Sequence, residues 1–139
     1  MSLITLVTVP YITLKHDPAT GILYVDWTGD QTKESVMDGC EKILYFLKQL
    51  KCTKALNDNS NVTSIWLDAT WWVAVDWFPR MYQAGCRLVA WVESPDPLCK
   101  LSMEETLKFD IKGINVQIFE NKKLADEWLK GYHTSLNLT

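Results

Sequence analysis

Apolar residues recur three and four positions apart in residues 66–82, and this spacing predicts a helix. The helix has two apolar stripes, separated by about a third of a turn. We expect the first stripe to face the core, and it contains Leu67, Trp71, Ala74, Val75, Phe78 and Tyr82. The second stripe contains Trp66, Thr70, Val73 and Trp77. One core does not explain both stripes, so the second predicts a binding surface.

Helical periodicity also occurs in three other segments. The longest ends at residue 50, includes Gly39 as a point of close packing, and has an apolar face of Val36, Cys40, Ile43, Leu44, Leu47 and Leu50. A looser pattern in residues 101–109 predicts a short helix. The last helix begins after Asn121, whose side chain suits an N-cap, and ends at Gly131.

Two strands are predicted near the N-terminal end. β-branched and aromatic residues alternate in residues 11–15 and 22–27, on either side of a loop with Pro18 and Gly21. This arrangement predicts an antiparallel hairpin. Residues 1–10 also alternate and form either an extra strand or a partner-facing arm, since Pro10 disfavours a central strand.

The remaining strands alternate with the helices. Residues 54–57 predict a short strand followed by an Asn-rich loop that reaches residue 60. Residues 87–92 predict a strand buried on both faces, and residues 115–119 predict a further strand. The order β-β-α-β-α-β-α-β-α predicts an α/β fold in which a hairpin enters a mainly parallel sheet.

Length and apolar content favour a single domain. The chain has 139 residues, 47% of them hydrophobic, which suffices for one core. We expect residues 11–132 to form this domain and residues 133–139 to form a C-terminal tail.

Composition and spacing argue against several classes of function. The formal net charge of -3 disfavours nucleic-acid binding, which requires clustered Lys and Arg. The four cysteines form no C-x-x-C pair and only His16 and His133 could join them, so we expect no metal and no cofactor. We also expect a cytoplasmic protein without stable membrane insertion, because no long apolar run or signal-peptide pattern occurs. No nucleophile has a visible partner base, so the protein is expected not to be an enzyme.

Three short motifs occur in order along the chain: Tyr24-Val25-Asp26-Trp27-Thr28-Gly29, then Leu56-Asn57-Asp58, then Phe119 with Ala125 and Trp128-Leu129. With these motifs, residues 11–132 resemble the SpoIIAA-like branch of the STAS superfamily. The architecture of that superfamily is related to the CRAL-TRIO fold of lipid-binding proteins. The resemblance implies a STAS-like sheet and a regulatory role without catalysis.

A phosphorylation site is also implied by the resemblance. In anti-anti-sigma members, the last hydroxyl of an Asp-Ser-Ser or Asp-Ser-Thr motif at a helix start is phosphorylated to control partner binding. The nearest counterpart is Asp68-Ala69-Thr70, which places Thr70 at the modified position but departs from the motif at Ala69 and Trp71. A helix N-terminus would favour a phosphate on Thr70. The other interpretation is an ordinary helix start capped by Asp68.

The tryptophans divide into two groups. We expect the first group to be core, and it contains Trp27, Trp71, Trp91 and Trp128. The second group, Trp66, Trp72 and Trp77, is either buried under another segment or part of a binding surface with Thr70 and Val73. In the predicted loop, Asp58 and Asn59 either hold backbone N–H groups or contact a ligand or partner.

These features predict a non-enzymatic interaction or regulatory module that binds a protein partner, or forms a homodimer, through the helix at residues 66–82. The alternative is a carrier or sensor of a hydrophobic small molecule or lipid, with reversible membrane contact. In that alternative, residues 95–103 serve as a mobile cover, because Pro95 and Pro97 prevent early regular structure.

Overall fold

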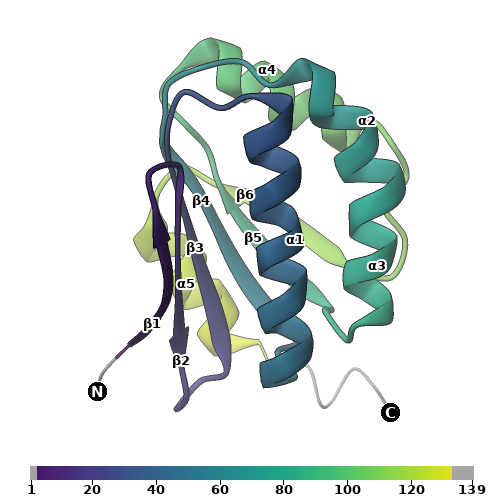
Figure 1. Ribbon diagram of the computed structural model, residues 1–139. Coiled ribbons are helices and arrows are strands. Elements are labelled where there is room, and N and C mark those ends of the chain that lie inside the picture. The colour runs from purple at the N-terminus through teal and green to yellow at the C-terminus, as the bar shows by residue number, and fades with distance from the viewer. Residues whose placement is uncertain (1–2, 133–139) are drawn as a thin grey trace.

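The computed structural model describes residues 3–132, and its central element is a six-stranded sheet whose strands follow chain order (Figure 1). The strands are β1 (Ile4–Val9), β2 (Ile12–Asp17), β3 (Ile22–Gly29), β4 (Lys54–Val62), β5 (Leu88–Val92) and β6 (Asn115–Phe119). The pairs β1–β2 and β2–β3 are antiparallel, and β3 to β6 run parallel. The predicted α/β fold is confirmed, and residues 4–9 form an edge strand.

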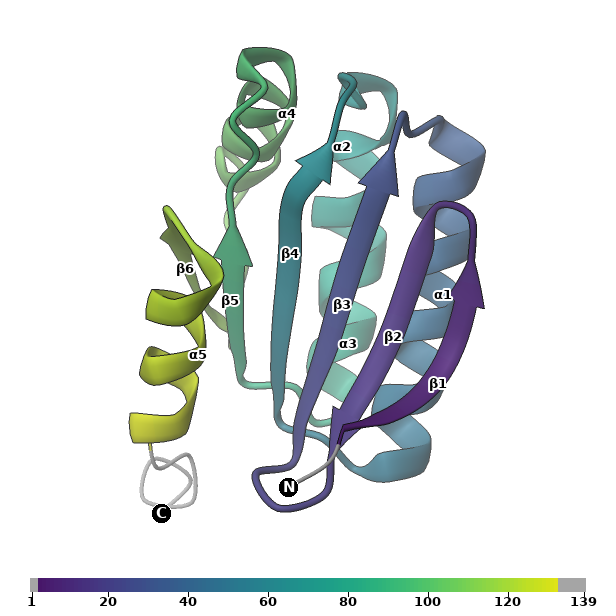
Figure 2. The ribbon, with the colours of Figure 1, turned by 90° about the vertical axis from the view of Figure 1, so that its left-hand side faces the viewer.

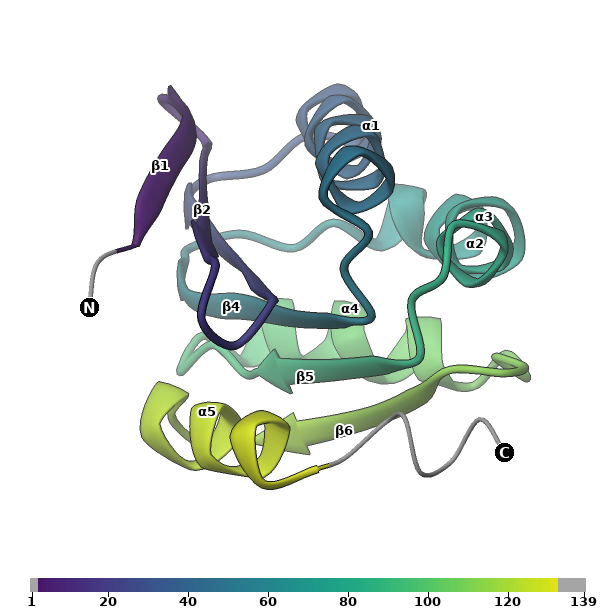
Figure 3. The same ribbon diagram turned by 90° about the horizontal axis from the view of Figure 1, so that it is seen from below.

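Helices cover both faces of the sheet (Figure 3). On one face lie α1 (Lys33–Leu50) and a segment that we call the Trp-rich helix, while α5 (Lys122–Gly131) lies on the other. The Trp-rich helix consists of η1 (Leu67–Ala69), α2 (Thr70–Trp72), η2 (Val73–Trp77) and α3 (Phe78–Gln83). Beyond the ends of β4 and β5 lies α4 (Pro97–Leu107), which packs beside α2 (Figure 2).

The core has two parts because side chains alternate across the sheet. Toward α1 and the Trp-rich helix, the buried residues include Leu14, Leu23, Val25, Trp27, Ile43, Leu47, Phe78, Met81, Val89 and Trp91. Toward α5, they are Ile22, Tyr24, Leu56, Leu88, Ala90, Val92, Ala125 and Leu129. Since helices cover both faces of β5, that strand is apolar at every position.

The Trp-rich helix turns a different side to the core from the one predicted. Its buried residues are Ala69, Thr70, Val73, Ala74, Trp77, Phe78 and Met81, and Trp66 just before it is also buried. The predicted core positions Leu67, Trp71, Val75 and Tyr82 are exposed, so that prediction is wrong. The predicted second stripe, Trp66, Thr70, Val73 and Trp77, is the one that faces the sheet.

A stretch of π-helix explains how this side stays buried. The buried pairs at residues 69–70, 73–74 and 77–78 repeat every four residues, which is longer than the 3.6 residues of an α-helical turn. Residues Val73–Trp77 form π-helix, whose i to i+5 bonds make a wider turn. The wider turn keeps successive pairs directed at the sheet.

Gly39 allows α1 to approach the sheet closely. A Cβ atom at this position would lie 2.4 Å from the ring of Trp27. The predicted role of this glycine in close packing is confirmed, because any side chain here would displace the indole.

Two segments are more regular than predicted, and the helix predicted at residues 101–109 begins earlier, at Pro97. Residues 57–60 are part of β4, which continues to Val62, rather than a loop. Residues 97–107 form α4, in which Pro97 occupies the first turn and Asp96 caps the helix by accepting from the Leu98 N–H at 2.8 Å. Cys99 and Met103 anchor α4 in the core, so this segment is not a loose cover.

Candidate functional site

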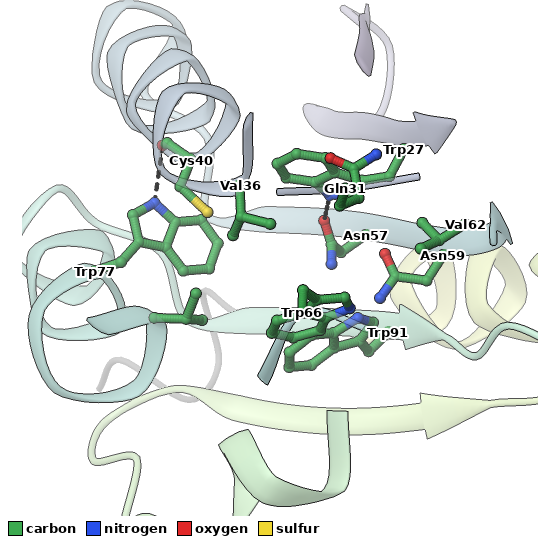
Figure 4. Close-up of a pocket in the computed structure, with 11 residues that line it drawn as sticks. Trp27, Gln31, Val36, Cys40, Asn57, Asn59, Val62, Trp66, Trp77 and Trp91 are labelled. Atoms are coloured by element: carbon green, nitrogen blue, oxygen red, sulfur yellow. Dashed lines mark hydrogen bonds between the residues drawn. The ribbon is translucent and has the colours of Figure 1, made fainter. Parts of the chain in front are cut away.

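An internal cavity of about 30 Å³ lies between the sheet and the two helices on its α1 side (Figure 4). It is located at the C-terminal halves of β3, β4 and β5, the end of a parallel sheet where α/β proteins usually bind ligands. Four indoles and three carboxamides contribute to its wall: Trp27, Trp66, Trp77, Trp91, Gln31, Asn57 and Asn59.

Strand register brings the polar residues to this cavity. Asn57 on β4 pairs with Val25 on one side and Trp91 on the other. Between the pairs Asp26–Asp58 and Thr28–Asn61, β3 advances two residues while β4 advances three, so β4 contains a bulge. The bulge lets both Asn59 and Val62 face the cavity, although they lie three positions apart in the chain.

Most polar groups around the cavity are paired. Trp27 Nε1 donates to Asn57 Oδ1 at 2.7 Å. Trp77 Nε1 donates to the backbone oxygen of Cys40 at 2.9 Å. Gln31 Nε2 donates to the backbone oxygen of Thr28 at 3.1 Å, and Gln31 Oε1 accepts from Ser35 Oγ at 2.8 Å. The Gln31 side chain therefore links the end of β3 to the first turn of α1 by hydrogen bonds.

Three groups at the cavity remain unpaired within residues 3–132. Trp91 Nε1 is the one fully buried side-chain nitrogen or oxygen of these residues without a hydrogen-bond partner. Asn57 Nδ2 makes no hydrogen bond in this part of the chain, and neither does the Asn59 side chain. Figure 4 shows both amide nitrogens pointing toward the Trp66 and Trp91 rings.

The wall of the cavity is uncharged. None of the described residues that line it is acidic or basic. Burial, with a smaller contribution from Glu41, raises the pKa of the Cys40 thiol well above its ordinary value, so the thiol stays protonated. The cavity therefore presents neutral donors and aromatic surface.

A second feature is an exposed apolar surface on the outer side of the Trp-rich helix. Trp71 is 62% exposed, and Leu67 and Val75 beside it are also exposed. On the neighbouring helix α4, Leu98 and Leu101 are exposed. We call these five residues the Trp71 face.

Comparison with known proteins identifies the fold. No protein-family profile matches the sequence, and no curated protein matches it at a significant level. The structure matches that of the anti-sigma factor antagonist SpoIIAA in its unphosphorylated form, with a TM-score of 0.58. The match covers 94% of this chain and 100% of that chain, at 11% sequence identity. The chain has the SpoIIAA fold. At this identity the likeness extends to the fold alone.

Within the SpoIIAA-like fold, the segment Asp68-Ala69-Thr70 does not form the capped helix start that the sequence predicted. The Trp-rich helix begins with a 3-10 turn that has no side-chain cap, and the N–H of Trp66 just before it is bound instead by Ser102 Oγ at 2.9 Å. Thr70 is buried, and its hydroxyl donates to the backbone oxygen of Leu67 at 2.9 Å. This hydroxyl is not presented to a modifying enzyme in this conformation.

The other predicted site residues fall in different places. Trp66, Val73, Trp77 and Asn59 line the cavity and are not part of an exposed surface. Trp72 is half-buried under the guanidinium of Arg80, 5.7 Å from its ring centre. Asp58 is buried in β4 and accepts from the Ser60 N–H at 2.9 Å, as predicted.

Sequence reasoning missed two parts of the site. Trp91 and Asn57 were not considered binding residues, since one lies in an apolar strand and the other precedes a predicted turn. Two carboxamides at alternate positions of a buried strand were an available signal, because Asn is uncommon in strands. Trp71 was predicted as core, because periodicity alone does not distinguish two apolar stripes.

None of the helices in residues 3–132 has both the length and the apolar content needed to cross a membrane. The same residues contain no group of three His, Cys, Asp or Glu side chains placed to hold a metal ion. His133 lies outside the described residues, as does the predicted tail.

Proposed function

We propose that the protein is a non-enzymatic interaction module that binds a protein partner, or a second copy of itself, through the Trp71 face. The observation that carries this proposal is the exposure of Trp71 on a helix whose opposite side is anchored in the core. A SpoIIAA-like fold is consistent with a regulatory interaction module.

The chemistry of the Trp71 face suits protein recognition. Tryptophan is enriched among the residues that dominate binding energy at protein interfaces, where it is surrounded by contacts that exclude water. Leu67 and Val75 are exposed four residues before and after Trp71, and Leu98 and Leu101 are exposed on the neighbouring helix α4. Exposed apolar surface on a stable domain commonly marks an interaction site.

The helix that carries Trp71 is held in place before any partner binds. On the side of the helix nearest α1, Arg80 donates to Glu41 Oε1 at 2.9 Å and to Asp76 Oδ2 at 2.8 Å. On the buried side, Trp77 donates to the backbone of α1. A preorganised face loses little conformational freedom on binding, which favours affinity.

Charge near the Trp71 face indicates the chemistry of the partner. Asp68 and Asp76 are exposed on the same helix, and Arg80 already pairs with Asp76 and Glu41. Three carboxylates against one guanidinium give this edge an excess of two negative charges. A partner with Lys or Arg at its rim would match it, and association should then weaken as salt rises.

The test compares Trp71→Ser with Tyr45→Ser. Tyr45 is a matched control because it is an aromatic residue on α1 with a similar exposure of 57%. Both variants should keep the thermal unfolding midpoint of the parent. Sedimentation velocity over a concentration series measures self-association, and a photo-crosslinking residue at position 71 or 45 in producing cells detects a partner.

The expected result is that association or a discrete crosslinked product depends on position 71 and not on position 45. Monomeric sedimentation of the parent, together with equal crosslinking from both positions, would overturn the proposal. Loss of folding in Trp71→Ser would also count against it, since it would place Trp71 in the core.

A second candidate function is the carriage of a hydrophobic small molecule. A groove of about 470 Å³ lies between α3 and residues 110–113, lined by Phe78, Pro79, Tyr82 and Ile111 among others. This volume is within the range of small-molecule sites, roughly 300–1,000 Å³, whereas the internal cavity is too small for a lipid chain. Native mass spectrometry, lipid extraction and liposome binding test this candidate, and the absence of any bound molecule and of liposome binding would exclude it.

A further inference from the structure

Trp91 Nε1 is a hydrogen-bond donor buried without a partner. The side chain is only 2% exposed and stacks on Trp66 with 6.1 Å between ring centres, so the N–H cannot turn to solvent. A buried donor left unpaired is costly, and natural proteins rarely keep one without a reason. The N–H borders the internal cavity, which points to an occupant there.

Asn57 adds a second donor whose orientation is determined by its surroundings. Trp27 Nε1 can only donate, so the atom that it contacts at 2.7 Å must be the amide oxygen of Asn57. The amide nitrogen of Asn57 is therefore the atom that faces the cavity (Figure 4). Asn59, two residues along β4, presents a third unpaired donor, its side-chain amide, to the same space.

We propose that the cavity is a binding site for a small uncharged molecule that carries a carbonyl oxygen, held between Trp91 Nε1 and Asn57 Nδ2. The lining has no charged side chain to compensate an ion, and burying an unpaired ion is far more costly than burying a neutral dipole. The indoles of Trp27 and Trp66 supply flat apolar walls for the rest of the molecule.

A carbonyl oxygen suits this donor set better than a water molecule does. A carbonyl oxygen only accepts, and its two lone pairs match two converging N–H groups. Water would also need acceptors for its two O–H groups, and Asn57 Oδ1 and Gln31 Oε1 each already accept one hydrogen bond. The Asn59 amide oxygen is the carboxamide oxygen at the cavity that accepts no hydrogen bond within residues 3–132.

The volume limits the size of the ligand. A single water needs roughly 10–15 Å³ of such space. The cavity has about 30 Å³, so it admits a molecule of very few non-hydrogen atoms. This site is separate from the Trp71 face, because none of the residues that line the cavity belongs to that face.

The experiment is a titration of the intact chain with formamide, followed by proton–nitrogen NMR of the indole and side-chain amide groups. Formate is the control ligand, since it has the same shape but carries a charge. Formamide over roughly 1–200 mM, a range suited to so small a probe, should shift the Trp91 indole signal and the Asn57 amide signals saturably. Formate should shift neither.

Three variants test whether the signal shifts come from binding in this cavity. Trp91→Phe keeps an aromatic ring but removes the N–H, and it should weaken formamide binding at least fivefold as measured on the Asn57 signals. Trp128→Phe on α5, outside the cavity, is the matched control and should leave binding unchanged. Asn59→Ala is a second cavity variant that tests the same site if Trp91→Phe does not fold.

Three results would overturn the proposal. The first is the absence of a saturable shift of the parent's Trp91 signal with formamide. The second is equal binding of formate and formamide. The third is a long-lived water, detected by magnetisation transfer to the Trp91 indole proton, that formamide does not displace.

Discussion

The indole nitrogen of Trp77 donates a 2.9 Å hydrogen bond to the backbone oxygen of Cys40. This bond joins the π-helical part of the Trp-rich helix to α1 across the core. Trp77 also packs against Phe78, with 4.9 Å between the ring centres. The buried side of the Trp-rich helix is therefore the side that stabilises the fold, and the Trp71 side is exposed.

Trp77→Ser should destabilise the domain strongly. The substitution removes a buried aromatic side chain and leaves the Cys40 carbonyl without this donor. Truncation of a core tryptophan typically costs about 3–5 kcal/mol in unfolding free energy. Urea denaturation followed by circular dichroism measures the change.

Trp71→Ser is the matched control for that measurement, since it is the same substitution on the exposed side of the same helix. It should alter the unfolding free energy by less than about 1 kcal/mol, as surface substitutions usually do. Comparable losses in the two variants would show that both stripes are core.

The order of strands and helices was predictable from the sequence because it depends on local periodicity. The hairpin around Gly21, the long helix ending at Leu50 and the buried strand at residues 88–92 each have an unambiguous apolar pattern. The side of the Trp-rich helix that faces the sheet was not predictable. Both of its stripes are apolar, and the choice between them depends on packing against α1 and on the π-helical turn.

The cavity was less predictable than the fold. Asn57, Asp58 and Asn59 resemble a turn in local chemistry, but pairing with β3 and β5 extends the strand through them. The convergence of Asn57 with Trp91 depends on parallel strand register between residues far apart in the chain. Sequence periodicity contains no information about that register.

Gly39→Ala should destabilise the protein, although alanine usually favours helices. The added methyl group would lie 2.4 Å from the Trp27 ring, so either α1 or the indole must move. Overpacking of this kind costs about 1–3 kcal/mol. Thermal unfolding and urea denaturation measure the effect.

Gly131→Ala on α5 is a suitable comparison, because a Cβ atom there has no neighbour within 4 Å. It should be neutral or stabilising by up to about 1 kcal/mol, the difference in helix propensity. A stabilising effect of Gly39→Ala would mean that α1 and Trp27 are not in close contact in solution.

Asp58→Ala should cost about 1 kcal/mol, the usual scale of a lost turn or cap hydrogen bond. Asp58 Oδ1 accepts from the Ser60 N–H at 2.9 Å, and this bond supports the bulge in β4. Asn59→Ala should cost less, since the Asn59 side chain makes no hydrogen bond within the described residues. Chemical denaturation of the two variants gives the comparison, and a larger loss for Asn59→Ala would contradict it.

Asp26→Asn should stabilise the protein at pH 7 but not at pH 3. Burial, together with repulsion from Asp58, raises the pKa of Asp26 above its ordinary value of 3.8, although a bond from Asn61 opposes the shift. Because the folded pKa is the higher one, ionised Asp26 disfavours folding at neutral pH. This unfavourable contribution disappears as the pH falls through the folded pKa toward 3.8. Asparagine keeps an amide oxygen that can accept from Asn61 and has no charge.

The measurement is the difference in unfolding free energy between Asp26→Asn and the parent at the two pH values, in which the titration of all other groups largely cancels. The difference should be positive at pH 7 and near zero at pH 3. Asp110→Asn, at an exposed carboxylate, should show little difference at either pH. Lower stability of Asp26→Asn than of the parent at pH 7 would contradict this prediction. It would mean that the ionised Asp26 carboxylate makes favourable interactions in the folded protein that outweigh its burial and its repulsion from Asp58.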